Sequence, residues 1–206
     1  MPGDDAERRR RSLRLPGFNY GQIGVYFITL CVQHRKYLFG DVVNDTMRVN
    51  EFGKIVADEW RRMPTMRPNV VLDEFVVMPN HFHALLAIEG SRRGVLNTPS
   101  GQSRSPSQTI GAVLRGFKAA TTKKINEYRG QFGEALWQRN YYEHVVRNDD
   151  ELRRIREYIV NNPMQWALDR ENPRTGVYQY APKDGIESIF GGIRPRPHPA
   201  PSSAAS

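Results

Sequence analysis

The stretch Val70–Glu89, VVLDEFVVMPNHFHALLAIE, decides the fold of this chain. Its first part, Val70–Met78, is rich in β-branched and aromatic residues, which favour a strand. Pro79-Asn80 is a turn signal, and the apolar stretch His81–Glu89 begins directly after it. We therefore expect two antiparallel strands that are joined by a tight turn, with two histidines at the start of the second strand.

The flanking sequence continues this mixed pattern. Gly24–Val32 is apolar and β-branched and predicts a buried strand, and Ala135–Val146 predicts another. Two stretches have apolar residues near helical spacing, which predicts amphipathic helices: Asn44–Arg62 and Ser107–Tyr128. The order strand, helix, two strands, helix, strand is typical of the ferredoxin-like pattern. We therefore expect an α+β fold, with an antiparallel sheet and helices on one face.

A third helix is predicted over Asp149–Asn161. Asn148, with Glu151 three residues later, resembles a capping box at its beginning, and Pro163 ends it. Leu152, Ile155 and Ile159 form its apolar stripe.

Length and composition predict one domain with a tail on either side. The chain has 206 residues, enough for one domain with a hydrophobic core. Residues 1–17 are predicted to be a disordered basic arm, 18–187 the domain, 90–106 a flexible loop inside it, and 188–206 a disordered tail rich in Pro and Ser. No apolar run reaches the roughly 18 residues that a membrane span requires. The single cysteine, Cys31, excludes an internal disulfide, so we expect a cytoplasmic protein.

The chain is basic, with a net charge of +8, and such a charge favours nucleic acid as a partner. The two predicted tails contribute part of this charge. Cations also occur along the two later helices and the strand between them, interleaved with Trp137, Tyr141 and Tyr142. Cations contact phosphates and aromatic rings stack on unpaired bases, so the pattern is typical of single-strand binding. The alternative is that solvated helix faces and core aromatics produce the same pattern. The candidate DNA-binding residues are Arg115, Lys118, Lys123, Lys124, Arg139, Arg147 and Arg154.

His81-Phe82-His83 predicts a metal site, because alternate strand residues face the same side. The Cα atoms of the two histidines would be about 6.6 Å apart, within reach of one ion. Phe82, Ala84 and Leu86 would then face the core, and the histidines would lie on the open face of the sheet. Two polar residues on an exposed strand are the alternative. Two histidines are also too few for a complete site, so a third ligand is required.

Tyr158 and Asn162 are the second pair of candidates. They are four residues apart on the third predicted helix and therefore share a face. Tyr158 lies at the edge of the apolar stripe, where a tyrosine usually serves packing. A tyrosine can also act as a nucleophile, and the Asn162 carbonyl oxygen can bind Mg²⁺ or Mn²⁺.

Three segments together resemble the REP-associated tyrosine transposases, which are related to insertion-sequence transposases with one catalytic tyrosine. The segments are VVMPNHFHALLAI at 76–88, GAVLRGFKAATTKKIN at 111–126, and LWQRNYYEHVVRNDDELRRIREYIVNNP at 136–163. They occur in the family's order and spacing, and the resemblance extends from about Arg14 to Asp184. The longest segment is its most specific signal. Loop 90–106 and the basic arm depart from the simplest family pattern.

The resemblance implies a role for each candidate residue. His81 and His83 match the metal ligands of the HUH motif, in which a hydrophobic residue separates two histidines. Tyr158 matches the nucleophile, and Asn162 matches the third ligand, where related transposases have Gln. Tyr141 and Tyr142 are rival nucleophiles, but they precede the helix. His144 is interpreted as a strand residue and not as a ligand.

The resemblance also implies an activity. A divalent ion, Mg²⁺ or Mn²⁺, would polarise a phosphodiester in single-stranded DNA, and Tyr158 would form a 5′-phosphotyrosine link that a 3′-hydroxyl later resolves. The expected partners are hairpins of palindromic repeats, and the expected location is cytoplasmic and nucleoid-associated. A domesticated protein that binds hairpins without cutting them is the alternative, and a rolling-circle replication initiator is a third reading. The resemblance leaves open whether the protein is a monomer or a homodimer.

Overall fold

The computed structural model describes residues 24–89, 109–169, 171 and 172. The predicted arm 1–17, the whole of loop 90–106 and the tail 188–206 lie outside the described residues, as do both ends of the predicted domain 18–187. The described elements, in chain order, are β1 (Gly24–Cys31), η1 (Gln33–Arg35), β2 (Gly40–Val43), β3 (Thr46–Val49), α1 (Glu51–Arg61), α2 (Met63–Met66), β4 (Val70–Val77), β5 (His81–Ile88), α3 (Ile110–Arg129), β6 (Tyr142–Val146), α4 (Asp149–Asn161) and η3 (Trp166–Leu168).

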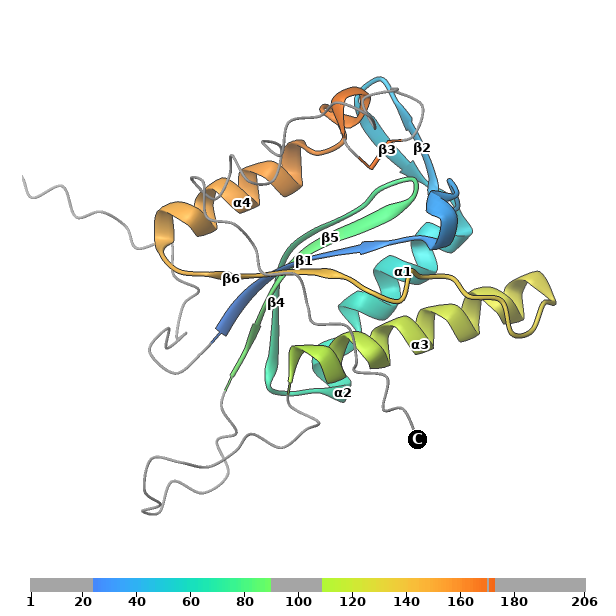
Figure 1. Ribbon diagram of the computed structural model, residues 1–206, viewed down its shortest axis with the longest axis horizontal. Helices are drawn as coiled ribbons and strands as arrows, with labels where there is room; N and C mark the ends of the chain where they lie inside the picture. Colours follow the sequence, from blue (N-terminus) through green and yellow to red (C-terminus); the bar gives the residue numbers. More distant parts are fainter. Residues whose placement is uncertain (1–23, 90–108, 170, 173–206) are drawn as a thin grey trace, which may run out of the picture.

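The α+β fold is confirmed: a four-stranded antiparallel sheet of order β4-β5-β1-β6 runs through the molecule (Figure 1). β4 and β5 form the predicted hairpin, which the Met78 amide closes by donating to the His81 carbonyl. β1 pairs along the whole of β5, with Cys31 opposite His81 and Thr29 opposite His83. The sheet therefore places the histidines in its second strand, beside the end of β1.

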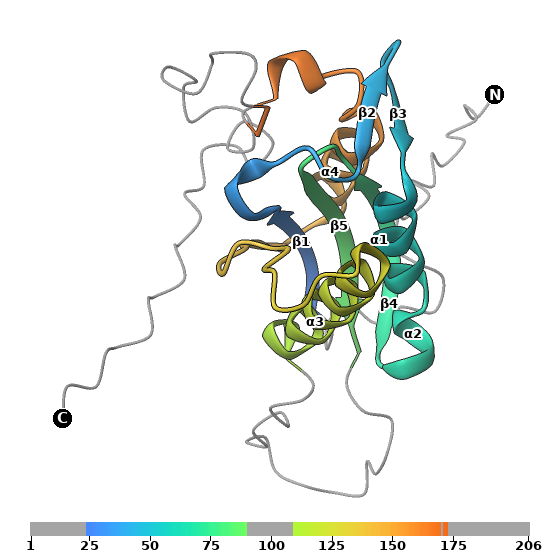
Figure 2. The ribbon, with the colours of Figure 1, turned by 90° about the vertical axis from the view of Figure 1, so that its right-hand side faces the viewer.

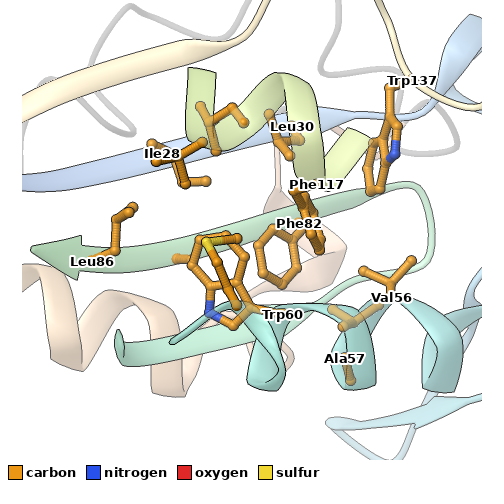
Figure 3. Packing of buried hydrophobic residues seen from close by; sticks show 14 of the residues in the cluster. Ile28, Leu30, Val56, Ala57, Trp60, Phe82, Leu86, Phe117 and Trp137 are labelled. Atoms are coloured by element: carbon orange, nitrogen blue, oxygen red, sulfur yellow. The ribbon is translucent and has the colours of Figure 1, made fainter. Parts of the chain in front are cut away.

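One face of the sheet is covered by α1 and α3, as the strand and helix order predicts. Phe82 on β5 packs between Trp60 of α1 and Phe117 of α3, with ring centroids 5.0 and 5.4 Å away (Figure 3). Leu86 of β5 and Ile28 of β1 extend this core along the same face. Alternate residues along β1 and β5, which are aliphatic or aromatic, thus form the main hydrophobic core together with α1 and α3.

The other face of the sheet is covered by α4, so the expectation of an open face behind the histidines is wrong. Leu152, Ile155 and Ile159 of α4 pack against Phe27 and Leu85 of the sheet. All eight residues of β5 are buried, and the histidine side chains are fully buried with them. Two-sided coverage explains why β5 is apolar almost throughout, since a strand buried on both faces shows no polar alternation.

The predicted helix Asn44–Arg62 is wrong in its first part. Thr46–Val49 forms β3, which pairs with β2, and α1 begins only at Glu51. Asn44 and Asp45 have φ values of 50° and 58°, the left-handed backbone that a two-residue hairpin turn requires. Asn50 then caps α1, because its side chain accepts from the backbone amides of Phe52 and Gly53. Met47 and Val49 fit a strand as well as a helix, and the turn chemistry decides between the two.

The other helices agree more closely with their predictions. α4 has the predicted bounds, and the Glu151 amide donates to the Asn148 side chain at 2.9 Å. The reciprocal half of the capping box is absent among the described contacts, because Glu151 accepts from the Arg147 amide and bonds His144 instead. The described part of the second predicted helix forms α3. None of the helices in the described part of the chain is long and apolar enough to cross a membrane.

The fourth strand is shorter than the predicted Ala135–Val146, since β6 covers only Tyr142–Val146. Before it, Trp137 makes an isolated bridge with Val32, and its indole donates to Thr121 of α3. Lys118 of α3 donates to the carbonyl oxygens of Gln138 and Arg139. Backbone hydrogen bonds at this bridge and side chains of α3 therefore hold the segment, in place of a continuous strand ladder.

Candidate metal centre and adjoining tyrosine

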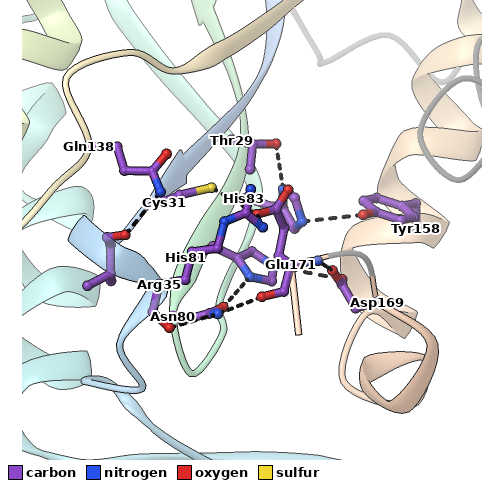
Figure 4. A network of polar contacts seen from close by, with 11 residues as sticks. Thr29, Cys31, Arg35, Asn80, His81, His83, Gln138, Tyr158, Asp169 and Glu171 are labelled. Atoms are coloured by element: carbon purple, nitrogen blue, oxygen red, sulfur yellow. Dashed lines mark hydrogen bonds and ion pairs between the residues drawn. The ribbon is translucent and has the colours of Figure 1, made fainter. Parts of the chain in front are cut away.

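The two histidines lie side by side at the start of β5, with ring centroids 4.5 Å apart (Figure 4). Both point toward the α4 side of the sheet, as the period-two argument predicts, while Phe82 points into the opposite core. Phe27 of β1 stacks on the His83 ring at 5.5 Å, and Trp166 of η3 lies 5.9 Å from the His81 ring. Aromatic neighbours thus fix both imidazole rings in place.

Polar neighbours hold one ring nitrogen of each histidine. His83 Nδ1 lies 2.8 Å from Thr29 Oγ1 on β1, and His81 Nδ1 lies 2.9 Å from Asn80 Oδ1. The Asn80 amide oxygen can only accept, so His81 Nδ1 donates to it, and Nε2 is the nitrogen that faces Asp169. Such partners are typical of metal-binding histidines, because they fix the ring and the ligand nitrogen.

Asp169 is the third donor of this cluster, and the sequence reasoning missed it. Its Oδ2 lies 3.9 Å from His81 Nε2. The ligand atoms of His81, His83 and Asp169 all lie within 4.8 Å of one another, and all three residues are buried. Burial raises the pKa of Asp169 above that of an ordinary aspartate, against a lowering effect of His83. This arrangement of two nitrogens and one carboxylate can hold a divalent metal ion.

The signal for Asp169 in the sequence is weak, because it is a single acid in the irregular segment after Pro163. Long-range contacts bring that segment to the histidines. Asn80 donates to the Glu171 carbonyl, Arg35 pairs with the Glu171 carboxylate at 2.5 Å, and Tyr37 bonds the Asn172 side chain. Contacts between positions so far apart along the chain leave no local pattern.

Asn162, the predicted third ligand, reaches the cluster beside Asp169. It is fully buried at the end of α4, and its Nδ2 donates to Asp169 Oδ2 at 3.4 Å. Among the described residues its Oδ1 has no hydrogen-bond partner. A buried carbonyl oxygen without a donor is costly, and a cation would satisfy it.

Tyr158, the predicted nucleophile, lies at the same place. Its hydroxyl is 3.3 Å from His83 Nε2, and its ring packs on the edge of Phe27 (Figure 4). α4 sets this position, because Ile155 and Ile159 on either side of Tyr158 are buried against the sheet. The four-residue spacing from Tyr158 to Asn162 then places both residues at the cluster.

The two rival tyrosines have different surroundings. Tyr142 lies opposite Thr29 in the sheet, and its ring packs on Phe27. Tyr141 packs against the α1 and α3 core, and burial together with Glu143 raises its pKa to about 12. A phenol with a raised pKa is harder to deprotonate, which weakens it as a nucleophile. His144 is buried in β6 and bonds Glu151 at 2.8 Å, apart from the metal cluster.

The candidate DNA-binding cations are dispersed. Arg115, Lys118, Lys123 and Lys124 belong to α3, on the opposite side of the sheet from α4. Lys118 bonds backbone carbonyls and its pKa is lowered by burial, and Lys124 pairs with the buried Glu59 of α1. The side chains exposed to solvent are those of Arg115, Lys123, Arg139, Arg147 and Arg154.

Comparisons with known proteins give one substantial sequence relative. An uncharacterized protein of Haemophilus influenzae is 40% identical over 167 residues, which cover 78% of this chain and 92% of that protein. No protein-family model matches the chain. Among solved structures, a REP-associated tyrosine transposase bound to a REP hairpin is 20% identical, with a TM-score of 0.46, over 69% of this chain and 67% of that one. A Deinococcus radiodurans protein described as a candidate transposase is 21% identical, with a TM-score of 0.42, over 70% and 93%.

Proposed function

We propose that this chain, which belongs to the same family as the Haemophilus influenzae protein, is a transposase-like enzyme that cuts and rejoins single-stranded DNA with Tyr158 as nucleophile. The observation that carries this proposal is the 3.3 Å approach of the Tyr158 hydroxyl to His83 Nε2, within a buried His-His-Asp cluster. The resemblance of segments 76–88, 111–126 and 136–163 to tyrosine transposases supports the same function.

The donor set fits a divalent ion such as Mg²⁺ or Mn²⁺. His81, His83 and Asp169 would hold it, and the Asn162 carbonyl oxygen, which has no donor within the described part of the chain, would be a fourth ligand. Carboxylate and carbonyl oxygens suit Mg²⁺ and Mn²⁺, and no cysteine lies in the cluster to favour a softer metal. When bound, the ion would polarise the scissile phosphodiester and offset its negative charge.

The chain's own residues would perform the covalent step. The Tyr158 hydroxyl loses its proton, and its oxygen forms a bond to phosphorus. The bond from phosphorus to the 3′ oxygen breaks, and this oxygen takes a proton and becomes a 3′-hydroxyl. The product is a 5′-phosphotyrosine link, and attack by a 3′-hydroxyl reverses the step and rejoins the strand. The link conserves the phosphodiester, so no nucleotide cofactor is required.

A covalent-adduct assay tests the proposal. A labelled hairpin with single-stranded flanks, drawn from inverted repeats next to the gene, is incubated with Mn²⁺ and then denatured. We expect a protein–DNA adduct with the wild type and none with Tyr158→Phe, which keeps the ring that packs on Phe27. Tyr141→Phe and Tyr142→Phe are the matched controls and should still form it.

The outcomes separate the alternatives. An adduct that persists in Tyr158→Phe would assign the nucleophile elsewhere, and its loss in Tyr142→Phe alone would assign it there. Hairpin binding by the wild type without any adduct, across all repeats and both metals, would instead identify a binding protein.

A further inference from the structure

A cavity lies on the α1 and α3 side of the sheet, whereas the metal cluster lies on the α4 side. The cavity is open to solvent, has a volume of about 790 Å³ and lies between the η1 turn and the C-terminal end of α3. In Figure 1 these two elements lie at the same end of the sheet. The lining residues are Val32, Gln33, His34, Lys36, Leu38, Phe52, Arg129, Gln131, Glu134 and Ala135.

Arg129 carries the strongest indication of a ligand. Its guanidinium lies over the Phe52 ring at 4.6 Å, and its Nη2 is buried without a hydrogen-bond partner in the part of the chain that the structure describes. A guanidinium keeps its charge at any physiological pH. This charge at the edge of the cavity favours an anion inside it.

The η1 turn divides three successive basic residues between the two sites. Arg35 pairs with Glu171, which adjoins Asp169 at the metal cluster, because the Glu171 amide donates to Asp169 Oδ1. His34 and Lys36 line the cavity instead. Lys36 is exposed and has no ion pair within the described ranges. The turn is therefore a basic bridge between the cluster and the cavity.

The backbone of this turn is unusual in a way that fits a binding role. His34 and Arg35 have φ values of 56° and 52°, and neither is glycine. Two successive left-handed residues cost free energy and persist only where the surroundings hold them. Here Asn80 donates to the Arg35 carbonyl, and the Val32 amide donates to the Asn80 carbonyl, which attaches the turn to the start of β5.

We propose that this cavity is a second site for the DNA strand, in which Lys36 and Arg129 bind phosphates of unpaired nucleotides that continue past the metal cluster. The inference rests on the proposed function for the identity of the strand. Val32 and Cys31 are adjacent in the chain, and Cys31 lies opposite His81, so the path around the end of β1 is short. Two cations against one exposed acid, Glu134, give the lining a positive balance, and Gln33 and Gln131 add polar groups.

Equilibrium binding of a short fluorescent single strand, in EDTA and with Tyr158→Phe protein, tests the site without catalysis. The variants are Lys36→Gln and Arg129→Gln, alone and combined, and the matched control is Arg48→Gln, an exposed cation of β3 that does not line the cavity. We expect the combined variant to bind about tenfold more weakly. The slope of log affinity against log salt should fall by about 1.4, since each phosphate contact to a single strand contributes about 0.7. Binding of a blunt hairpin without unpaired flanks should change less than twofold.

Equal affinity and salt slope for the combined variant and wild type would overturn the site, as would an equal loss in Arg48→Gln. Thermal unfolding curves check the fold, because Arg129→Gln also removes the contact with Phe52. If that variant unfolds, the Lys36→Gln variant alone tests the site. A fall of its salt slope by about half of the change expected for the combined variant supports the site, and an unchanged slope overturns it. The adduct assay tests the proposed enzymatic activity separately. If the wild type forms no adduct but the cavity variants lose strand binding, the enzymatic proposal is overturned and the binding site stands. If the wild type forms the adduct but the cavity variants bind the strand normally, only the binding site is overturned.

Discussion

At the scale of single residues, the candidate centre is defined by which nitrogen of each histidine faces the other candidate residues. Thr29 and Asn80 bond the Nδ1 atoms, so the Nε2 atoms face Asp169 and Tyr158. Period-two spacing predicted that His81 and His83 share a face, and four-residue spacing predicted that Tyr158 and Asn162 do. Asp169 could not be predicted in this way, because tertiary contacts bring its irregular segment back to β5.

The roles of Asp169 and Asn162 as ligands can be separated by titrating each variant with Mn²⁺ in a calorimeter. Asp169→Asn removes the charge of the cluster and should weaken binding at least about 100-fold, whereas Asn162→Ala should weaken it about tenfold, because a neutral oxygen contributes less than a carboxylate. Asp58→Asn, which changes an exposed carboxylate on α1, is the control. An Asp169→Asn protein that binds Mn²⁺ as the wild type does would remove Asp169 from the ligand set.

At the scale of elements, α4 determines where Tyr158 lies. The sequence predicted the bounds of α4, since capping, apolar spacing and Pro163 are all local signals. The β2–β3 hairpin was missed because Met47 and Val49 fit both periods. The packing of α4 over the second face of the sheet was missed because such packing leaves no local pattern. Asp73 of β4 adds a further attachment, because its carboxylate accepts from Arg156 Nε and Nη2.

The cap of α4 can be tested by substitution of Asn148, whose side chain accepts from the Glu151 amide. Asn148→Ala should lower the free energy of unfolding by about 1 kcal/mol, and Asn148→Ser should restore most of it, because serine is also a good cap. Urea unfolding followed by circular dichroism measures both variants. The interpretation fails if the alanine and serine variants are equally stable.

At the scale of the whole molecule, the candidate centre joins layers that are far apart in the chain. His81 and His83 belong to the sheet, and Asp169 and Asn162 follow or end α4. An ion held by both groups would bind the folded state and not the unfolded chain. It would therefore stabilise the whole domain and not one element.

Thermal unfolding with and without Mn²⁺ measures this effect. At a free concentration one hundred times the dissociation constant, the ion should stabilise the wild type by about 2.7 kcal/mol and raise Tm accordingly. His81→Ala should abolish the rise, while His34→Ala, which removes an exposed histidine outside the cluster, should retain it. An undiminished rise in His81→Ala would place the ion at another site.

Asn80 has a consequence for how this centre comes apart. Its one side chain orients His81 through its oxygen and holds the Arg35 and Glu171 carbonyls through its nitrogen. The exit of β1, the entry of β5 and the segment that carries Asp169 therefore share a single anchor. Partial opening at this corner would release all three segments together, so the centre would lose its ligands in one cooperative event. The backbone amides of the three segments would then exchange their hydrogens at one shared opening rate.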